Sequence, residues 1–222
     1  MAFGALLKDV YGNPWITPDS TPMSLANKLV YDYSSSYSAE VQIPVNTAAP
    51  YMVCAHSNTS NCMFWLRRAD GSFYFNMQRN EGYIGVVTVY IFTFVIPQPL
   101  PRMGIAIWNS SGQCILTNET KVMTPPVAYG TPGVLDDSGG LVVRDLAGKW
   151  AIVPQMTGLQ VGVINTGGGV RPYSSPMHTC AYYNGSTTHI NSTTKNPPGD
   201  IVQNQGYTST YDVIYAMDVS KY

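Results

Sequence analysis

The 222-residue chain has few charged side chains. Asp, Glu, Lys and Arg together make up 11% of it, against about 25% in an ordinary soluble domain. Its 12 basic and 13 acidic residues give a net charge of −1, and the densest basic site, Arg67-Arg68, is closed off by Asp70. Nucleic-acid binding needs clustered Lys and Arg, so we expect no nucleic-acid partner. The polar surface must come from Ser, Thr, Asn, Gln and 16 Tyr, which favours packing against copies of the chain or other proteins.

The sequence also lacks long apolar runs and a secretory leader. The longest run, residues 83–97, is too short to cross a bilayer and is rich in β-branched and aromatic residues, so it predicts a buried strand rather than membrane insertion. Met1 leads directly into an apolar strand, with no basic segment and no small-residue cleavage site. We therefore expect the protein to fold and assemble in a cytoplasm.

Metal and disulfide patterns are missing too. The four cysteines form no Cys-x-x-Cys pair and have no histidine at metal-ligand spacing, so we expect free, mostly buried thiols. His178 and His189 flank a Tyr-rich strand, but the nearest downstream carboxylate is the distant Asp200. The sequence predicts no metal site and no cofactor.

What the chain does contain is a repeat. Residues 3–17 align without a gap with residues 103–117, and the register holds through Met23 and Met123. Each copy has the pattern of a strand, an Asp/Asn-x-x-Gly turn and a second strand. A chain of this length could be one large β domain or two of about 100 residues, and the repeat favours two related β domains in tandem.

No segment shows a convincing 3.6-residue period, so we predict an all-β fold of two tandem β-sandwich domains. The first spans residues 1–98 and the second 102–222, with a Pro-x-Pro-x-Pro linker at residues 97–101 in which strand pairing cannot continue. The polar stretch 184–205, within the longer segment 184–207, predicts a surface loop for recognition or assembly.

Two further hairpins are predicted inside these domains. Residues 63–76 surround the turn sequence Asp70-Gly71, and residues 140–153 surround Gly148.

One motif suggests catalysis. Asp136-Asp137-Ser138-Gly139-Gly140 resembles the Gly-Asp-Ser-Gly-Gly signature of chymotrypsin-like serine proteases. In such a site His56 would take the Ser138 proton while Asp70 oriented the ring. His56 and Ser138 are closer in sequence than in that family, and Asp136 replaces its glycine. Asp-Ser-Gly-Gly is also common turn chemistry. We expect no enzyme and no catalytic residues, with a serine hydrolase as the minor alternative.

Six tyrosines lie between residues 173 and 215: Tyr173, Tyr182, Tyr183, Tyr207, Tyr211 and Tyr215. Tyr combines an apolar ring with a polar tip and is enriched at interfaces. The alternative for any single residue is a tyrosine on a β face with its hydroxyl in solvent. We predict interface or glycan contacts at Tyr173, Tyr182, Tyr183, His189 and Tyr207.

The opening Met1-Ala2-Phe3-Gly4, followed by alternating apolar residues, Asp-x-x-Gly and a second strand, resembles the start of small virion proteins of tailed bacteriophages. The resemblance covers residues 3–24 and 103–124, and those proteins form minor tail, tail-tip or fibre components. It implies a structural virion protein that is assembled in the host cytoplasm. Its partners would be copies of itself, in a homo-oligomer (trimer or ring), and other virion proteins. The resemblance implies no functional residues. The alternative is a module for host attachment that binds a surface glycan or receptor through Tyr-rich loops of the C-terminal domain.

Overall fold

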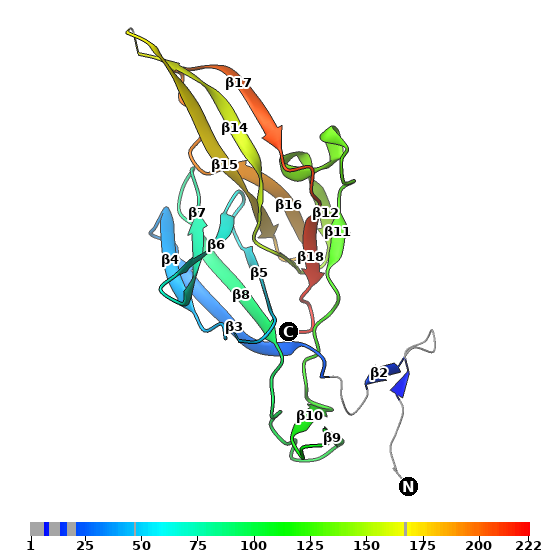
Figure 1. The fold of residues 1–222 in the computed structure, drawn as a ribbon. Helices are drawn as coiled ribbons and strands as arrows, with labels where there is room; N and C mark the ends of the chain where they lie inside the picture. The colour runs from blue at the N-terminus through cyan, green and yellow to red at the C-terminus, as the bar shows by residue number, and fades with distance from the viewer. Residues whose placement is uncertain (1–6, 9–13, 17–20, 47, 167) are drawn as a thin grey trace.

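The computed structural model describes residues 7–8, 14–16, 21–46, 48–166 and 168–222. These residues form strands joined by turns and two short 3-10 segments (Figure 1). Among them no helix is long and apolar enough to cross a membrane. The elements are β1 Leu7–Lys8, β2 Pro14–Ile16, β3 Ser24–Tyr33, β4 Ser38–Ile43, β5 Tyr51–Ser57, β6 Met63–Ala69, β7 Ser72–Gln78, β8 Gly85–Thr93, β9 Ala106–Trp108, β10 Cys114–Thr117, β11 Val127–Tyr129, η1 Leu135–Asp137, η2 Gly139–Leu141, β12 Arg144–Ala147, β13 Trp150–Ile152, β14 Met156–Asn165, β15 Val170–Tyr183, β16 Thr187–Thr194, β17 Val202–Ser209 and β18 Ile214–Asp218.

The predicted all-β sandwich class is confirmed. Hydrogen-bonded strands run in the order β11-β18-β13-β5-β15-β6-β7-β4, and β8 pairs with both β5 and β3. The β6–β7 hairpin forms as predicted, and its turn residues Asp70 and Gly71 have positive φ angles of 51° and 74°, the backbone that Asp-Gly sequences favour in two-residue turns. The chain alternates along β3, where half-buried and exposed side chains succeed each other, as on a strand with one covered face.

Strands from both predicted domains contribute to one core, which differs from the expected tandem sandwiches at 1–98 and 102–222. Ile152 of β13 pairs with Ala55 of β5, and Cys180 of β15 pairs with Met63 of β6. Phe64 and Ile190 belong to the same buried cluster. Hydrophobic alternation shows which face of a strand is buried but not which strand lies beside it, so the sequence could not show this mixing.

The hairpin predicted over residues 140–153 is wrong. Its two strands, β12 and β13, follow each other across Gly148 but pair elsewhere, β12 with β16 and β13 with β18 and β5. The Trp150 backbone N–H donates to Thr188 Oγ1 at 2.9 Å instead of continuing a two-stranded ladder. The chain therefore changes direction at Gly148, whose φ is 90°. Strand β13 then joins β18 and β5 instead of pairing with β12.

The surface loop predicted over 184–205 is also wrong. Thr187–Thr194 forms β16, which pairs with β15 and β12. Thr188 and Ile190 of this strand are fully buried. The stretch is polar by composition, but threonine is β-branched and suits a pleated surface, where hydrogen bonds satisfy its hydroxyl.

The repeated hairpins, in contrast, have the same strand register. The paired residues are Leu7–Ile16 and Lys8–Pro14 in β1–β2, and Ile107–Leu116 and Trp108–Cys114 in β9–β10. Each pair in the second hairpin is its counterpart in the first moved by one hundred positions, and each hairpin has a register shift at the same place. The remainder of the first predicted hairpin lies outside the described residues.

The two copies meet where each repeat ends. The Met123 N–H donates to the Met23 carbonyl at 2.8 Å, and the Leu25 N–H donates to the Lys121 carbonyl at 2.9 Å. Met23 and Met123 are equivalent positions and both pack against the buried cluster that contains Phe92. The ends of the two repeats therefore pair antiparallel at the base of the body, from which β9–β10 projects (Figure 1).

Candidate interaction surface

Three strands extend beyond the shared core as an arm, which we define as β14, the N-terminal half of β15 and β17 (Figure 1). Strand β14 lies in the middle, paired antiparallel with β15 on one side and β17 on the other. Ile164 near the tip pairs with both Arg171 and Val202. Arg171 is the only Asp, Glu, Lys or Arg in the three strands.

Neither face of the arm is fully covered by the rest of the described chain. Every residue of β14 from Leu159 to Ile164 is half-buried, whereas a strand with one covered face would alternate buried and exposed residues. At the tip, Val170 and Ile201 are each 66% exposed. The arm therefore presents partly apolar surface on both sides, with Arg171 as the one charged residue of its strands.

Two of the predicted contact residues, Tyr173 and Tyr207, lie in the arm on either side of β14. Tyr207 donates its hydroxyl proton to the Thr157 carbonyl at 2.8 Å and accepts a bond from the Gly140 N–H. The Tyr173 hydroxyl donates to the Asn196 carbonyl. Both hydroxyls thus bind within the chain and brace the arm against neighbouring segments.

Of the other three predicted residues, Tyr182 and Tyr183 lie at the opposite end of β15, and His189 lies opposite Tyr182 on β16. Tyr182 and Tyr183 are nine or more residues from Tyr173, about 30 Å at about 3.3 Å per residue. Tyr183 packs edge-on to His56 with ring centroids 5.9 Å apart, and the Lys149 ammonium lies 5.1 Å from its ring centroid. His189 Nδ1 lies 2.8 Å from Asp145 Oδ1. The five residues therefore form two separate groups rather than one patch.

The motif around Ser138 has structural partners instead of a catalytic set. Ser138 is fully buried, and its Oγ has no hydrogen-bond partner among the described residues. Asp137 accepts bonds from Arg144 and from Thr131 Oγ1. These contacts favour the ionised carboxylate and lower the Asp137 pKa from its ordinary value, the Arg144 hydrogen bond most strongly.

The histidine proposed for the hydrolase alternative is engaged elsewhere. His56 Nε2 lies 3.4 Å from the Tyr90 hydroxyl, and no contact within the described part of the chain joins this ring to Ser138. Gly139 and Gly140 make room for Tyr207, whose hydroxyl oxygen would lie 2.7 and 2.9 Å from a Cβ added at these two positions. Close packing against Tyr207 thus accounts for Gly140, and Gly139 is further required by its positive φ of 55° and by the nearby Thr157 carbonyl. Over the described ranges, no group of three or more His, Cys, Asp or Glu could hold a metal ion.

The four cysteines are free and buried, as predicted. Burial raises the pKa of the Cys62 thiol to about 12 and raises those of Cys54 and Cys180 further. These thiols remain protonated and contribute to packing.

A second apolar surface lies on the β9–β10 hairpin and the segment before it. Met103 is 82% exposed, Ile105 71% and Trp108 51%. Ile105 and Ile107 line a cavity of about 270 Å³ together with Leu116. The buried cluster inside this hairpin is small, so much of its apolar surface faces outward.

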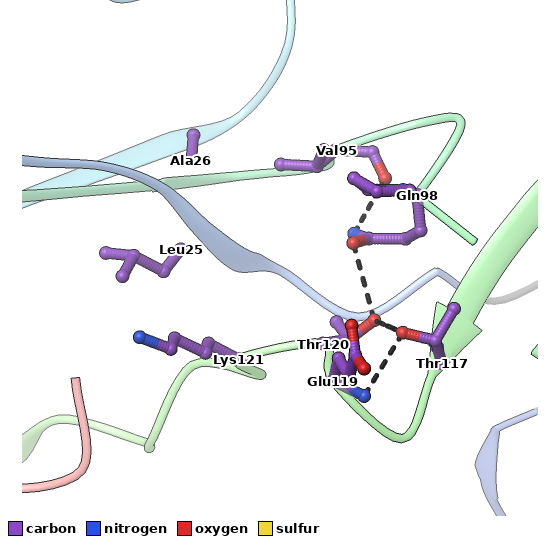
Figure 2. A pocket seen from close by; sticks show the side chains of 9 residues that line it. Leu25, Ala26, Val95, Gln98, Thr117, Glu119, Thr120 and Lys121 are labelled. Atoms are coloured by element: carbon purple, nitrogen blue, oxygen red, sulfur yellow. Dashed lines mark hydrogen bonds between the residues drawn. The ribbon is translucent and has the colours of Figure 1, made fainter. Parts of the chain in front are cut away.

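The segments around Gln98 and residues 117–121 connect this hairpin to the body, and we call this connection the joint. Gln98 lines a cavity of about 300 Å³ between the start of β3, the segment after β8 and the segment 117–121. Its side chain lies between Val95 and Thr120 (Figure 2). Gln98 Nε2 donates to Ser24 Oγ and to the Val95 carbonyl, each at 2.9 Å, and its Oε1 accepts from Thr120 Oγ1 at 3.3 Å. Both the Nε2 and the Oε1 of Gln98 are therefore hydrogen-bonded within the chain, which fits a structural connection better than a ligand site.

Sequence reasoning missed a further set of residues on the outer face of β4, β6 and β7. Trp65, Asn76 and Glu40 lie side by side there by strand register. The signal was present in the alternation of Phe64-Trp65-Leu66-Arg67, but it identifies a face only after the neighbouring strands are known.

Comparisons with protein-family models, with curated proteins and with solved structures find no match to this chain. The role of the protein is therefore inferred from its own fold and surfaces.

Proposed function

We propose that the protein is a structural virion component that acts through protein–protein assembly, as a tail-tip, fibre or decoration subunit of a tailed bacteriophage. The observation that carries the assembly role is the arm, with apolar side chains at its tip and a single charged residue in three strands. The proposed place in a virion is supported by the resemblance of the repeated hairpins to the start of small virion proteins of tailed bacteriophages.

An arm of this kind fits contact with other subunits. Edge strands of free proteins usually carry charges or proline, which prevent pairing with other chains. Among the strands of the described residues, β17 pairs with β14 alone, and its residues Val202–Ser209 include no proline and no charged side chain. An apolar surface of few charges matches the buried centre of a protein interface. We propose that the arm packs against neighbouring copies in a trimer or ring, or against other virion proteins.

The apolar β9–β10 surface supports the same role. It projects from the base of the body, away from the arm (Figure 1). Different surfaces at two ends of one subunit suit heterologous contacts, in which one end of a subunit meets a different end of its neighbour.

The test is the mass of the purified protein in solution by light scattering. We expect a discrete oligomer that a Val170→Asp/Ile201→Asp double variant dissociates, because two carboxylates would be desolvated at the contact. The matched control is Val30→Asp on β3, a position 60% exposed outside the arm, which should leave the mass unchanged. A monomer at high micromolar concentration would contradict self-assembly, and an unchanged mass in the double variant would exclude the arm.

A further inference from the structure

The outer face of four adjacent strands, β15, β6, β7 and β4, carries a row of aromatic and polar side chains. Trp65 pairs with Asn76, and Asn76 pairs with Glu40. Residues directly opposite in antiparallel strands share a face, so these three point the same way. Their neighbours in sequence, Phe64 and Phe75, point into the buried core. The row is therefore built on rigid strands backed by the core.

A shallow cavity of about 320 Å³ lies over this row. Its lining includes Ser38, Glu40, Trp65, Asn76, Gln78 and Lys195. Asn76 is only 8% exposed although it belongs to the outer face. The cavity thus combines one large aromatic ring with amide, hydroxyl and charged groups, the mixture of an apolar surface and a few placed polar groups typical of small-ligand sites.

Hydrogen bonds within the chain hold several of these groups in place. Glu40 accepts two bonds from Arg67 at 2.6 and 2.8 Å, and the Arg67 guanidinium carbon lies 4.6 Å from the Tyr74 ring centroid. Gln78 Nε2 donates to the Lys195 carbonyl at 2.8 Å, which ties the segment after β16 to the edge of the cavity. Groups fixed in this way lose little conformational freedom when a ligand binds.

The Trp65 ring has two further contacts. His178 stacks on it with centroids 5.1 Å apart and planes 24° apart, and the Lys195 ammonium lies 4.4 Å from its centroid. His178 is fixed in β15, whereas Lys195 has a flexible aliphatic chain. A ligand can therefore displace the ammonium from the indole ring and keep it as an ionic partner.

The charge of the cavity is unbalanced. Arg67 neutralises Glu40, and Lys195 forms no ion pair within the described ranges of the chain. One free positive charge beside an aromatic ring and uncharged amides complements a ligand with one carboxylate, an apolar C–H face and several hydroxyls.

We propose that this face binds an acidic sugar, a pyranose unit with one carboxylate. The C–H face of the sugar stacks on Trp65, the side chains of Asn76 and Gln78 bind its hydroxyls, and Lys195 pairs with its carboxylate. The site is separate from the arm, so the proposal goes beyond the assembly role and does not depend on it.

The experiment is calorimetric titration of the full chain with 3′-sialyllactose and with a hyaluronan hexasaccharide, using lactose as the neutral probe. We expect at least one acidic saccharide to bind and lactose to bind at least about tenfold more weakly, a difference of about 1.4 kcal/mol. Trp65→Ala should weaken acidic binding about tenfold or more. Lys195→Gln should weaken acidic binding and leave the lactose titration unchanged.

Two matched controls separate the site from general effects. Trp108→Ala removes an exposed tryptophan on β9, and Lys121→Gln removes a lysine from the joint cavity; both should bind acidic saccharide like the unaltered protein. Absence of binding to both acidic probes, equal affinity for lactose, or full binding by folded Trp65→Ala protein would overturn the proposal. Trp65→Ala should leave the solution mass unchanged, so failure here is distinguishable from failure of the assembly role.

Discussion

Two buried histidines should make the stability of this protein depend strongly on pH between neutrality and pH 5. His56 and His178 are each 8% exposed. Burial, then Lys149 and Lys28, lowers the pKa of His56 to about 4. Burial, then Lys195, lowers the pKa of His178 to about 4. Both rings are therefore neutral in the folded protein at pH 7, and each Nδ1 lacks a hydrogen-bond partner among the described residues.

The sign follows from comparing folded and unfolded states. An unfolded histidine has a pKa of about 6.5, above the folded value, so the unfolded chain takes up protons first as pH falls. The stabilisation is fully present above pH 6.5 and is lost as pH falls toward 4. Between pH 7 and pH 5 each histidine should lower the free energy of unfolding by about 2 kcal/mol, and the pair by about 4 kcal/mol. That is a large share of the about 5–15 kcal/mol typical of a folded domain.

Urea unfolding at pH 7, 6 and 5 measures this loss. The carboxylates with lowered pKa, Asp32, Glu40 and Asp137, lose their stabilising contribution mainly below about pH 5, so most of the change in the chosen window comes from the histidines. His56→Gln and His178→Gln should each remove about half of the pH dependence. Equal unfolding free energies at pH 7 and pH 5, or ring pKa values near 6.5 by NMR, would refute the reasoning.

Two matched pairs of substitutions test the packing of buried positions. Gly158→Ala places a Cβ 2.4 Å from Tyr207 Cε2 and 2.5 Å from the Thr208 carbonyl, so urea unfolding should show a loss of about 2–4 kcal/mol; Gly199→Ala, which meets nothing within 4 Å, is the control. Ser138→Ala removes a buried, unpartnered hydroxyl and should change stability by less than about 1 kcal/mol, whereas Thr188→Ala, which breaks bonds to Trp150 and Gly148, should lose about 1–3 kcal/mol. Equal losses in either matched pair would contradict the packing described here.

Local features of the fold could be predicted because their causes are local. Asp70-Gly71 adopts the positive φ angles of a tight turn, and this requirement is visible in two residues. The two repeated hairpins have the same strand register, as expected from sequences that align without a gap through both strands and the turn. The shared core could not be predicted. The pairing of Ile152 with Ala55 joins segments about a hundred residues apart, and no sequence pattern in either segment identifies the other as its partner. The buried strand β16 was missed because its threonines resemble those of a loop until their hydrogen bonds, such as that of Thr188 to Gly148, are known.

The predicted contact residues also show that sequence patterns do not reveal which residues lie side by side in space. Tyr173, Tyr182 and Tyr183 are near one another in sequence, but a strand of 14 residues carries them from the tip of an arm into the body. The sequence shows that these tyrosines are close along the chain, but it does not show that one long strand contains all three. His178, in the middle of the same strand, stacks on Trp65 from a segment more than a hundred residues away in sequence. Strand β15 therefore borders both the proposed assembly surface and the proposed sugar site, and the Trp65 site exists only because β15 and β6 are neighbours.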